Sequence, residues 1–398
     1  MSISDPDPII IAGAARTPLG AFMGALSSVS APQLGATAIR AALREVAIDA
    51  AQVSEVLMGC VLPAGLGQAP ARQAARAAGL PDAVGATTLN KVCGSGMKAV
   101  MLGHDLIRSG SAGIVVAGGM ESMSNAPFLL GDMRRGHKAG SAEVLDHMMN
   151  DGLEDAYERG RPMGAFGEAT AELYQFSRAD QDTYAIETLE RAQGAVTSGH
   201  FDGECAPVTV MTRKGEALVA RDERPEQINA QKIPTLRSAF GEGGTITAAS
   251  SSANADGAAA LVLARQSTAE HSGLPILARI LGHATHSQEP AWFTTAPIPA
   301  IRKLLEQVGW QAQDVDLFEI NEAFAVVAMA AAKEIGIPRD KLNVNGGACA
   351  LGHPIGATGA RIIVTLIHAL RARGLKRGIA CLCIGGGEAT AIALEIAA

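Results

Sequence analysis

The sequence contains few aromatic and few charged residues. Phe, Trp and Tyr make up 4% of the 398 residues and charged side chains 18%, whereas hydrophobic residues reach 48%. A chain of this length predicts two or three domain-sized units with a large apolar core. Because aromatic side chains are scarce, that core must be built from Ala, Val, Ile and Leu, with 45 glycines allowing close packing. Small-residue cores suit layered α/β architectures.

Long basic runs, long apolar runs and a leader-like start are also missing from the sequence. The formal net charge is −7, and nucleic acids or anionic membranes are bound by clustered Lys and Arg. No apolar run reaches the roughly 18 residues of a membrane span, and the opening residues MSISDPDP do not resemble a signal peptide. We therefore expect a cytoplasmic protein with neither nucleic acid nor membrane as a partner.

Paired cysteines are missing as well. The six cysteines are scattered through the chain without a CxxC pair, at Cys60, Cys93, Cys205, Cys349, Cys381 and Cys383. Such spacing matches neither a disulfide framework nor a zinc site, so no metal is expected. Reduced thiols are the expected state, and some of them are free for chemistry.

One cysteine has a distinctive setting. Cys93 stands in the segment NKVCGSGMKAV, where a glycine-rich turn leads into a predicted helix. At the first turn of that helix, unpaired N–H groups and the positive end of the helix dipole would favour thiolate over thiol. Cys93 is therefore a candidate nucleophile, although an isolated cysteine is more often a small core residue.

Two parts of the chain share one pattern of elements. A helix face with apolar residues at positions 0, 4 and 7 begins at Ile39 and again at Ile301, an offset of 262 residues (301 minus 39). A strand follows each helix, at residues 53–58 and 315–320. The pattern indicates an internal repeat of βαβ type.

The turns at Cys93 and His353 extend this repeat. Each is followed by a predicted helix, a strand and a run of glycines. Two similar halves imply two layered sheets packed against each other, each with parallel strands that carry helices.

The predicted strand ends lie at one edge of these sheets. Gly59 and Asn321 mark one pair of ends, and Gly118 and Gly385 mark the other. Ligands of such sheets bind beyond the carboxyl ends of the strands, so the chemistry should meet at this edge. Residues 122–245 break the pattern and are predicted to form an inserted loop domain.

One histidine is a candidate for this edge. His353 lies in the segment NGGACALGHPIGATG, whose glycines let backbone approach a ligand closely. A capped turn would explain the histidine equally well. Four other histidines have polar neighbours and are expected at the surface: His104, His137, His200 and His271.

A thiol and an amide complete the candidates at the strand ends. Cys383 precedes three glycines whose N–H groups suit an oxyanion hole. Cys381 should face the same way along the strand, and a core cysteine is the alternative for either residue. Asn321 follows the other strand, where an isolated Asn would ordinarily be a helix cap.

Together these segments resemble the thiolase family. The motifs are Asn-x-x-Cys93-x-Ser-Gly, Gly118-Gly-Met-Glu-Ser122, Asn321-Glu-Ala-Phe, Gly352-His353-Pro-x-Gly and Cys383-x-Gly-Gly-Gly, in this order across essentially the full length. The resemblance implies a duplicated α/β fold with a layered α/β/α/β/α core. The expected N-terminal half is residues 1–270, with the loop domain at about 122–245, and the C-terminal half is 271–398.

The same resemblance implies an acyl-CoA C-acyltransferase. Cys93 would attack an acyl-CoA thioester to give an acyl-enzyme and free CoA, with His353 taking the thiol proton. Cys383 would then remove an α-proton from a second acetyl-CoA, and the carbanion would attack the acyl group. His353 with a water held by Asn321 would serve the enolate, and the N–H groups of Cys93 and Gly385 would serve the acyl carbonyl. The reverse reaction is thiolysis of a 3-ketoacyl-CoA.

The expected partners are acyl-CoA and CoA. Both are substrates, so no cofactor is expected, and the chain is expected to form a homodimer or homotetramer. The resemblance implies that Met163 lies near the reacting group, that Ser252 contacts pantetheine and that Arg224 contacts a CoA phosphate. Many family members carry Asn at the place of Ser250 and Gly at Ala253, and biosynthetic members often carry His at Pro162. These departures leave the acyl-chain preference open.

Two other functions remain as alternatives. A decarboxylating ketoacyl synthase has a Cys-His-His site, whereas Cys383 stands here where a second histidine is needed. A non-catalytic acyl-CoA or lipid carrier on the same fold would be signalled by the loss of Cys93 or His353, and both are present.

Overall fold

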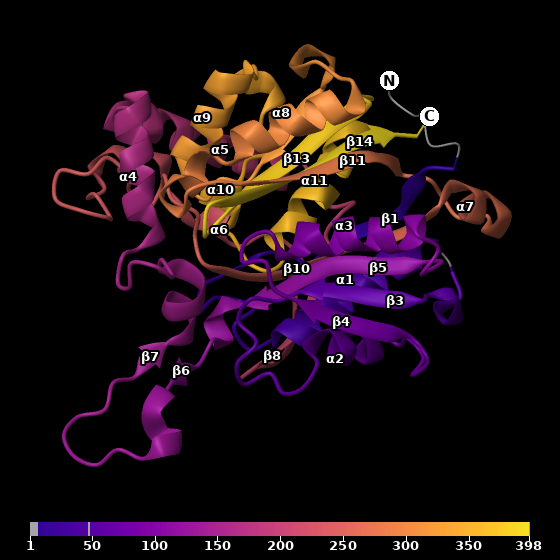
Figure 1. The fold of residues 1–398 in the computed structure, drawn as a ribbon, viewed down its shortest axis with the longest axis horizontal. Helices are drawn as coiled ribbons and strands as arrows, with labels where there is room; N and C mark the ends of the chain where they lie inside the picture. Colours follow the sequence, from indigo (N-terminus) through magenta and orange to yellow (C-terminus); the bar gives the residue numbers. More distant parts are fainter. Residues whose placement is uncertain (1–6, 47, 398) are drawn as a thin grey trace.

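The computed structural model describes residues 7–46 and 48–397. Ten strands of this part of the chain form one mixed sheet in the order β12-β13-β14-β11-β1-β10-β5-β3-β4, with the short β2 paired to β10 (Figure 1). The strands are β1 (Ile9–Arg16), β2 (Gly20–Ala21), β3 (Glu55–Gly59), β4 (Gly85–Leu89), β5 (Val115–Ser122), β10 (Ala255–Arg265), β11 (Ala278–Ser287), β12 (Leu317–Ile320), β13 (Arg377–Ile384) and β14 (Glu388–Ile396).

The expectation of two separate sheets of parallel strands is wrong in two respects. The halves are joined by a short antiparallel pairing of β1 with β11, in which Ile10 faces Arg279 and Ile11 faces Ala278. Parallel pairing is confined to β3 with β4, β3 with β5, and β12 with β13. The other strand pairs of the sheet run antiparallel, and among them β13 and β14 are joined by a tight turn, a connection that requires antiparallel neighbours.

Helices cover both halves of the sheet and fill the space between them, so the predicted α/β/α/β/α layering is confirmed. One outer core lies under α1 (Ala31–Val46) and α2 (Pro70–Ala77), and the other lies under α8 (Pro297–Val308) and α9 (Ala325–Ile335). The middle core contains α3 (Ser95–Arg108) and α11 (Thr358–Ala372) together with residues from both halves of the sheet. Figure 1 shows these two helices between the β13–β14 strands and the β5–β3–β4 strands.

Glycines allow the two central helices to approach each other closely. A Cβ atom on Gly96 would lie 2.8 Å from the backbone nitrogen of Ala360, and one on Gly359 would collide with the backbone nitrogen of Met97. The first turns of α3 and α11 are therefore held face to face. Cys93, which precedes α3, packs against the apolar cluster that contains Ile355, two residues after His353.

The repeat recognised in the sequence corresponds to recurring elements. The series β3, α3, β5 in the first half matches β12, α11, β13 in the second. Gly118 was expected at a strand end but lies inside β5, because β5 stays paired with β10 as far as Ser122. A Cβ atom on Gly118 would collide with the carbonyl oxygen of Ala259, so this glycine serves close strand packing.

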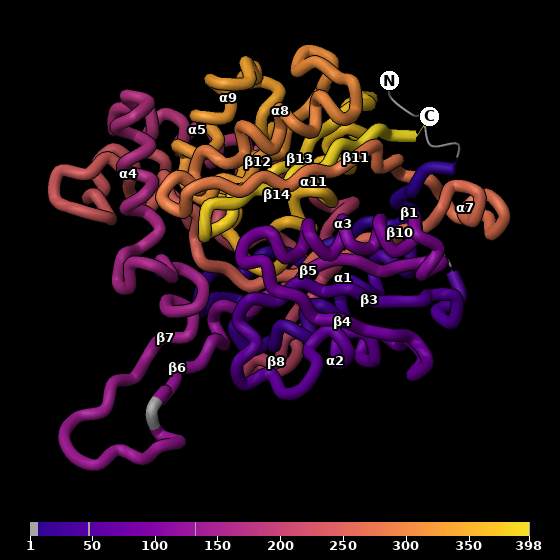
Figure 2. Tube along the Cα trace, in the orientation of Figure 1, coloured from indigo at the N-terminus to yellow at the C-terminus, as the bar shows by residue number. Residues whose placement is uncertain are grey.

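The residues between β5 and β10 lie outside the ten-stranded sheet. It contains α4 (Met163–Tyr174), α5 (Arg178–Thr197), α6 (Arg224–Gln227) and the strand pairs β6 (Phe128–Leu129) with β7 (Leu145–Asp146) and β8 (Val208–Thr212) with β9 (Gly215–Val219). Two successive helices, α4 and α5, form here, because Gln175 adopts a left-handed φ of 56° and Ser177 begins α5 with a capping box. Figure 2 shows the β6–β7 segment extending away from the body.

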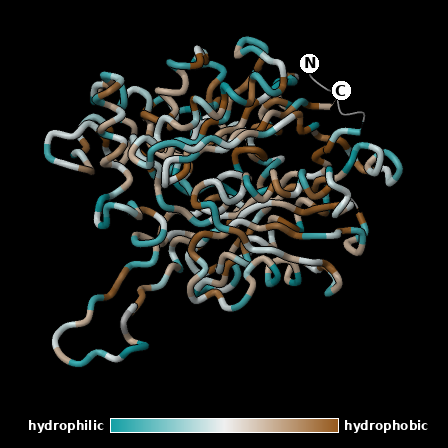
Figure 3. Tube along the Cα trace, viewed as in Figure 1, coloured by the Kyte–Doolittle hydropathy of each residue, from teal (hydrophilic) through white to brown (hydrophobic). Residues whose placement is uncertain are grey.

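Hydropathy follows this architecture. Hydrophobic residues follow the strands and inner helices, whereas hydrophilic residues follow many of the outer turns (Figure 3). Among the described residues, no helix has both the length and the apolar character needed to cross a bilayer.

Candidate active site

Cys93 lies in a turn that comes directly before α3. The turn is stabilised by Ser95, whose hydroxyl accepts a hydrogen bond from the Lys91 N–H (2.8 Å) and donates one to the Val92 carbonyl (2.7 Å). Val92 adopts a left-handed φ of 47°, an uncommon conformation for a β-branched residue. The conformation directs the partly buried Cys93 side chain against the apolar cluster of Val61, Leu62 and Ile355.

The expectation that the helix start favours a thiolate is wrong for the resting protein. Burial raises the pKa of the Cys93 thiol to about 11, against the lowering effect of the N–H groups of Gly385 and of Cys93 itself. The N-cap of α3 is Gly94, so Cys93 precedes the first helical turn and lies outside the strongest part of its dipole. A neutral thiol at this place needs a neighbouring base before it can attack.

Gly385 brings a second segment to the sulfur of Cys93. It opens the turn between β13 and β14, and its N–H faces the Cys93 thiol. A Cβ atom on Gly385 would lie 3.3 Å from the Met163 side chain and 3.8 Å from that of Val92. The absence of a side chain therefore keeps the backbone N–H accessible to a group bound at Cys93.

The structure distinguishes the two cysteines of β13. Both side chains are fully buried. The Cys381 sulfur lies 4.0 Å from the Pro297 carbonyl oxygen, in the core beneath α8. Burial raises the pKa of Cys383, and the nearby Cys93 raises it further. Cys383 is thus the thiol that lies beside the candidate nucleophile.

His353 is held by its backbone and by one ring nitrogen. Its N–H donates to the Ala253 carbonyl (2.8 Å), and its Nδ1 lies 2.6 Å from the Thr358 hydroxyl oxygen. That hydroxyl donates its own proton to the Pro354 carbonyl (3.0 Å). Since the hydroxyl proton is engaged, Nδ1 carries the ring proton and donates it to Thr358, which leaves the lone pair on Nε2.

The free ring nitrogen of His353 is buried and available. Among the described residues it has no hydrogen-bond partner. Burial, with a smaller contribution from the charge of Arg361, lowers the pKa of His353 to about 3. The imidazole is therefore neutral near pH 7 and can accept a proton at Nε2. Capping of a turn, the alternative reading of this histidine, does not account for a buried and unpaired Nε2.

Asn321 presents a buried amide at the end of β12. Its backbone N–H donates to the Cys381 carbonyl (2.9 Å), and its side chain is 1% exposed. Both polar atoms of the amide lack a hydrogen-bond partner within the described part of the chain. The helix-cap alternative is wrong, because the N-cap of α9 is Phe324. Buried unpaired amides are rare, and they mark sites where a ligand or water is bound.

Glu121 is a part of the site that the sequence reading missed. Its carboxylate accepts hydrogen bonds from the N–H groups of Val61 (2.9 Å), Leu62 (3.1 Å) and Gly356 (2.9 Å). It therefore fastens the turn after β3 to the turn that contains His353. Burial raises the pKa of Glu121 to about 7. A carboxylic acid within the apolar strand 115–122 was the available signal for such a role.

The three residues expected to bind CoA lie around this site. Ser252 donates its backbone N–H to the Ala323 carbonyl (2.9 Å), two residues beyond Asn321. Met163 begins α4 and packs with Cys383 in the same apolar cluster. Arg224 begins α6 and approaches the turn at Gly352, and among the described residues its buried Nε has no partner.

The position of Arg224 depends on a buried ion pair. The guanidinium of Arg16 on β1 binds the Asp222 carboxylate at 2.7 Å and also contacts Glu204, and all three side chains are fully buried. The segment that carries Arg224 is thereby attached to the first strand of the sheet. The sequence around Asp222 gives no sign that this carboxylate is internal.

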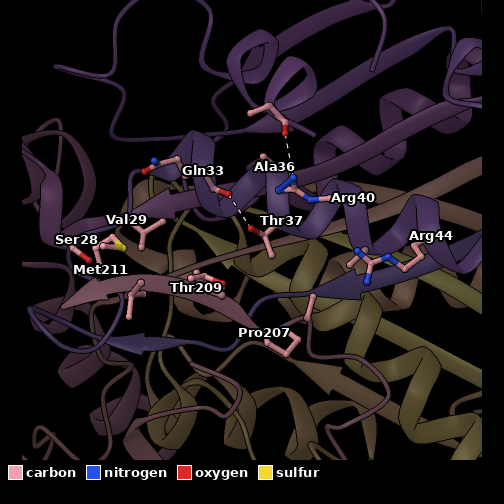
Figure 4. A pocket seen from close by; sticks show the side chains of 15 residues that line it. Ser28, Val29, Gln33, Ala36, Thr37, Arg40, Arg44, Pro207, Thr209 and Met211 are labelled. Carbon is pink, nitrogen blue, oxygen red and sulfur yellow. Dashed lines mark hydrogen bonds between the residues drawn. The ribbon is translucent and has the colours of Figure 1, made fainter. Parts of the chain in front are cut away.

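A surface pocket of about 500 Å³ lies elsewhere, between α1 and β8. Figure 4 shows its lining, with Arg40 and Arg44 along α1 and Pro207 and Thr209 on the facing segment. It contains none of the residues predicted for the site, so we assign it no part in the chemistry at Cys93.

Comparison with known families and structures identifies the class of protein. Residues 9–267 match the family described as "Thiolase, N-terminal domain", and residues 274–396 match "Thiolase, C-terminal domain". The chain belongs to the thiolase family. Its fold agrees with the resemblance noted in the sequence.

Relatives are similar over nearly their whole length. The chain is 48% identical to acetyl-CoA acetyltransferase 2 of Arabidopsis thaliana, covering 98% of each chain, and 47% identical to acetyl-CoA acetyltransferase of Escherichia coli, covering 97% and 98%. The crystal structure of the Bacillus anthracis acetyl-CoA acetyltransferase matches with a TM-score of 0.95 and 40% identity, covering 98% and 99%. The crystal structure of a thiolase of Ascaris suum in complex with coenzyme A matches with a TM-score of 0.92 and 41% sequence identity. The match covers 98% of this chain and 100% of the Ascaris chain.

Proposed function

We propose that this thiolase is an acetyl-CoA C-acyltransferase that condenses two acetyl-CoA molecules to acetoacetyl-CoA and CoA, and that also catalyses the reverse thiolysis. The observation that carries the proposal is the proximity of two thiols, Cys93 and Cys383. It is supported by the neutral His353 with its unpaired Nε2, two residues before Ile355, which packs in the same apolar cluster as Cys93. Relatives named acetyl-CoA acetyltransferase support the acetyl group as the substrate. A structural neighbour in complex with coenzyme A supports CoA as the carrier.

The first stage forms an acyl-enzyme. His353 accepts the thiol proton of Cys93 at Nε2, and the sulfur attacks the thioester carbonyl. The N–H groups of Cys93 and Gly385 stabilise the negative charge that develops on the oxygen. CoA leaves as a thiolate and takes the proton of Cys383, so the stage ends with acetyl-Cys93, a Cys383 thiolate and a protonated His353.

The second stage forms the carbon–carbon bond. The Cys383 thiolate removes an α-proton from a second acetyl-CoA, and the enolate oxygen is stabilised by His353 and by a water held by Asn321. The carbanion attacks the acetyl group on Cys93. The Cys93 thiolate departs and recovers its proton from His353, which restores every group to its starting state. No step draws on a metal or a redox cofactor.

The two alternative functions, a ketoacyl synthase and a non-catalytic carrier, differ from this proposal in the residue required at position 383 and in whether the protein turns over its substrate. A ketoacyl-synthase mechanism needs a second histidine where Cys383 stands, and a non-catalytic carrier needs neither thiol. Met163 and Phe293 pack around Cys383 and are the side chains through which we expect the length of the acyl chain to be limited. Arg224 and Ser252 are proposed to hold the phosphate and pantetheine parts of CoA.

The testing experiment compares the wild type with Cys93→Ala and with Cys349→Ala as a matched buried control. CoA-dependent thiolysis is measured over a chain-length series of 3-ketoacyl-CoA, and acetylated protein is detected by intact mass. We expect Cys93→Ala to lose both turnover and the acetyl adduct, while Cys349→Ala keeps both. Turnover by Cys93→Ala would overturn the nucleophile assignment. Binding of acetyl-CoA by the wild type without turnover and without an acetyl adduct would favour the carrier.

Three further expectations concern the oligomeric state of the protein, its cellular location and the division of the chain into two halves. We propose a homodimer or homotetramer, and the sheet edge at β4, which is free of a second neighbour among the described residues, offers a surface for such pairing. Light scattering of the purified chain tests this. Cytoplasmic location, and the two halves 1–270 and 271–398 with their loop domain at about 122–245, also stay predictions from the sequence.

A further inference from the structure

A second cluster of chemically capable side chains lies away from the active site. It consists of His104 and Asp105 on α3 and His283 on β11. His104 was expected at the surface, but it is 7% exposed, because α3 is enclosed between the two halves of the sheet. His104 is nine residues beyond the start of α3 at Ser95, roughly 13 Å along the helix axis, so the cluster is remote from Cys93.

The three side chains direct one atom each to a common point. The Asp105 Oδ1 lies 3.0 Å from the His104 Nδ1 and 3.0 Å from the His283 Nε2, and these two nitrogens lie 3.3 Å apart. The imidazole rings meet edge to face, with an interplanar angle of 90°. Two nitrogens and one oxygen therefore form a nearly equilateral triangle.

The size of this triangle matches metal coordination. Zinc is bound at about 2.0–2.1 Å by histidine nitrogen and at about 2.0–2.2 Å by carboxylate oxygen. In a tetrahedral arrangement with such bonds, neighbouring ligand atoms lie roughly 3.3 Å apart. A hydrogen-bonded cluster does not require this shape, because the two oxygens of the carboxylate can each serve one histidine, whereas here a single oxygen serves both.

The exposure of the cluster also suits a cation. The Asp105 side chain is 51% exposed, which leaves a path for an ion and a fourth, solvent position.

We propose that His104, Asp105 and His283 form a site for a divalent transition-metal ion of the zinc type, and that this ion links the two halves of the fold. His104 and Asp105 belong to the segment matched by the N-terminal domain, and His283 belongs to the segment matched by the C-terminal domain. A bound ion would join α3 to β11 directly. It stabilises the assembled halves and takes no part in the chemistry at Cys93.

The test uses the full chain stripped of metal by a chelator and then titrated with cobalt(II). We expect one equivalent to bind with the visible d–d absorption of a tetrahedral centre and without sulfur-to-cobalt charge-transfer bands. Zinc should raise the melting temperature by about 2–4 °C at a hundredfold excess over its dissociation constant. Thiolysis activity should be the same with and without the metal.

The variants His283→Gln and Asp105→Asn each remove one ligand, and His271→Gln removes an exposed histidine on α7 (Gln266–Ser272) as the control. We expect cobalt affinity to fall at least roughly 100-fold in the first two and to stay unchanged in the third. The metal-induced shift is measured against the metal-free form of the same variant, so a lower intrinsic stability does not obscure it. Absence of binding, binding unaffected by His283→Gln, or sulfur charge-transfer bands would overturn the proposal and leave the cluster as a hydrogen-bonded contact.

Discussion

The Nδ1 atom of His353 lies 2.6 Å from the hydroxyl oxygen of Thr358, and the hydroxyl proton is donated to the Pro354 carbonyl. This pair of contacts fixes the tautomer of the imidazole, since a hydroxyl whose proton is engaged can only accept from Nδ1. The lone pair on Nε2 is thereby kept for the proton of Cys93. Thr358 is a positioning residue, because it acts on the reaction through His353.

Replacing Thr358 tests this relationship. Thr358→Val keeps the shape of the side chain and removes the acceptor, so a fraction of His353 will carry its proton on Nε2. We expect acylation of Cys93 to slow by roughly 10- to 100-fold, a part of the effect that general base catalysis provides. Single-turnover release of CoA from acetyl-CoA measures it. Thr358→Ser is the matched control and should retain most of the rate; equal losses in both variants would mean that the methyl group matters and the hydroxyl does not.

The two cysteines of β13 should behave differently. Cys383→Ser places a much weaker acid beside Cys93. We expect acetyl-Cys93 still to form, with the departing CoA thiolate taking its proton from solvent, while carbon–carbon bond formation falls by roughly 10²- to 10⁴-fold. Cys381→Ser is the matched control on the same strand, and it should keep condensation because its sulfur faces the Pro297 carbonyl. Intact mass reports acylation, and acetoacetyl-CoA absorbance reports condensation. Failure of Cys383→Ser to become acylated would contradict the separation of roles.

The contribution of Arg224 to substrate binding should depend on whether the substrate carries the nucleotide phosphates of CoA. We expect Arg224→Gln to raise KM for acetyl-CoA by roughly 10-fold, since a charge-assisted hydrogen bond to phosphate is lost. KM for acetyl-pantetheine, which lacks the nucleotide phosphates, should not change. Arg221→Gln, an exposed neighbour, is the control. A rise in KM for both substrates would place Arg224 at the thioester end of the site.

Glu121 should produce a pH dependence of stability. Its pKa rises from an ordinary 4.5 to about 7 on folding, so between these values the folded protein binds more protons than the unfolded chain. Stability from this group is therefore present below pH 4.5 and is lost as the pH rises to 7, by up to about 3 kcal/mol. Urea unfolding of the wild type and Glu121→Gln across pH 4.5–8 measures the difference.

The contributions of other titrating groups cancel in that comparison. The pKa of Glu319 is also raised to about 7, by burial, with the charge of Arg361 opposing the rise, and the pKa of His353 is lowered to about 3. Both groups are present in the two proteins. We expect the stability advantage of the wild type over Glu121→Gln to shrink as the pH rises from 4.5 to 7. A difference that stays constant with pH would show that Glu121 keeps its ordinary pKa.

The sequence carried the identity of the site because its motifs are local. The turn before α3, the glycine-rich turn at His353 and the three glycines after Cys383 are short segments whose conformations depend on glycine and proline within a few residues. The repeat at an offset of 262 residues predicted the helices and strands of both halves, since periodicity is also a local property. The layered core followed from the same pattern.

The details that govern reactivity depended on tertiary contacts. Strand alternation alone could not choose between Cys381 and Cys383. Nor could the sequence predict that Cys93 would be a neutral thiol, because burial by distant segments sets its pKa. It missed Thr358 and Glu121, and it placed His104 at the surface, since the covering half of the fold lies about 180 residues away. The single continuous sheet was also unforeseen, because strand order depends on pairing between segments far apart in the chain.

The sequence by itself thus predicted which groups this protein has for its chemistry: Cys93, His353, Cys383 and an amide at Asn321, in two α/β halves. Only the tertiary structure decided which of them meet, which ring nitrogen of His353 is free, and which thiol lies beside Cys93. The physical reason is that residue type and local conformation are encoded by neighbours in sequence, whereas burial, charge and hydrogen-bond partners are supplied by elements from the other half.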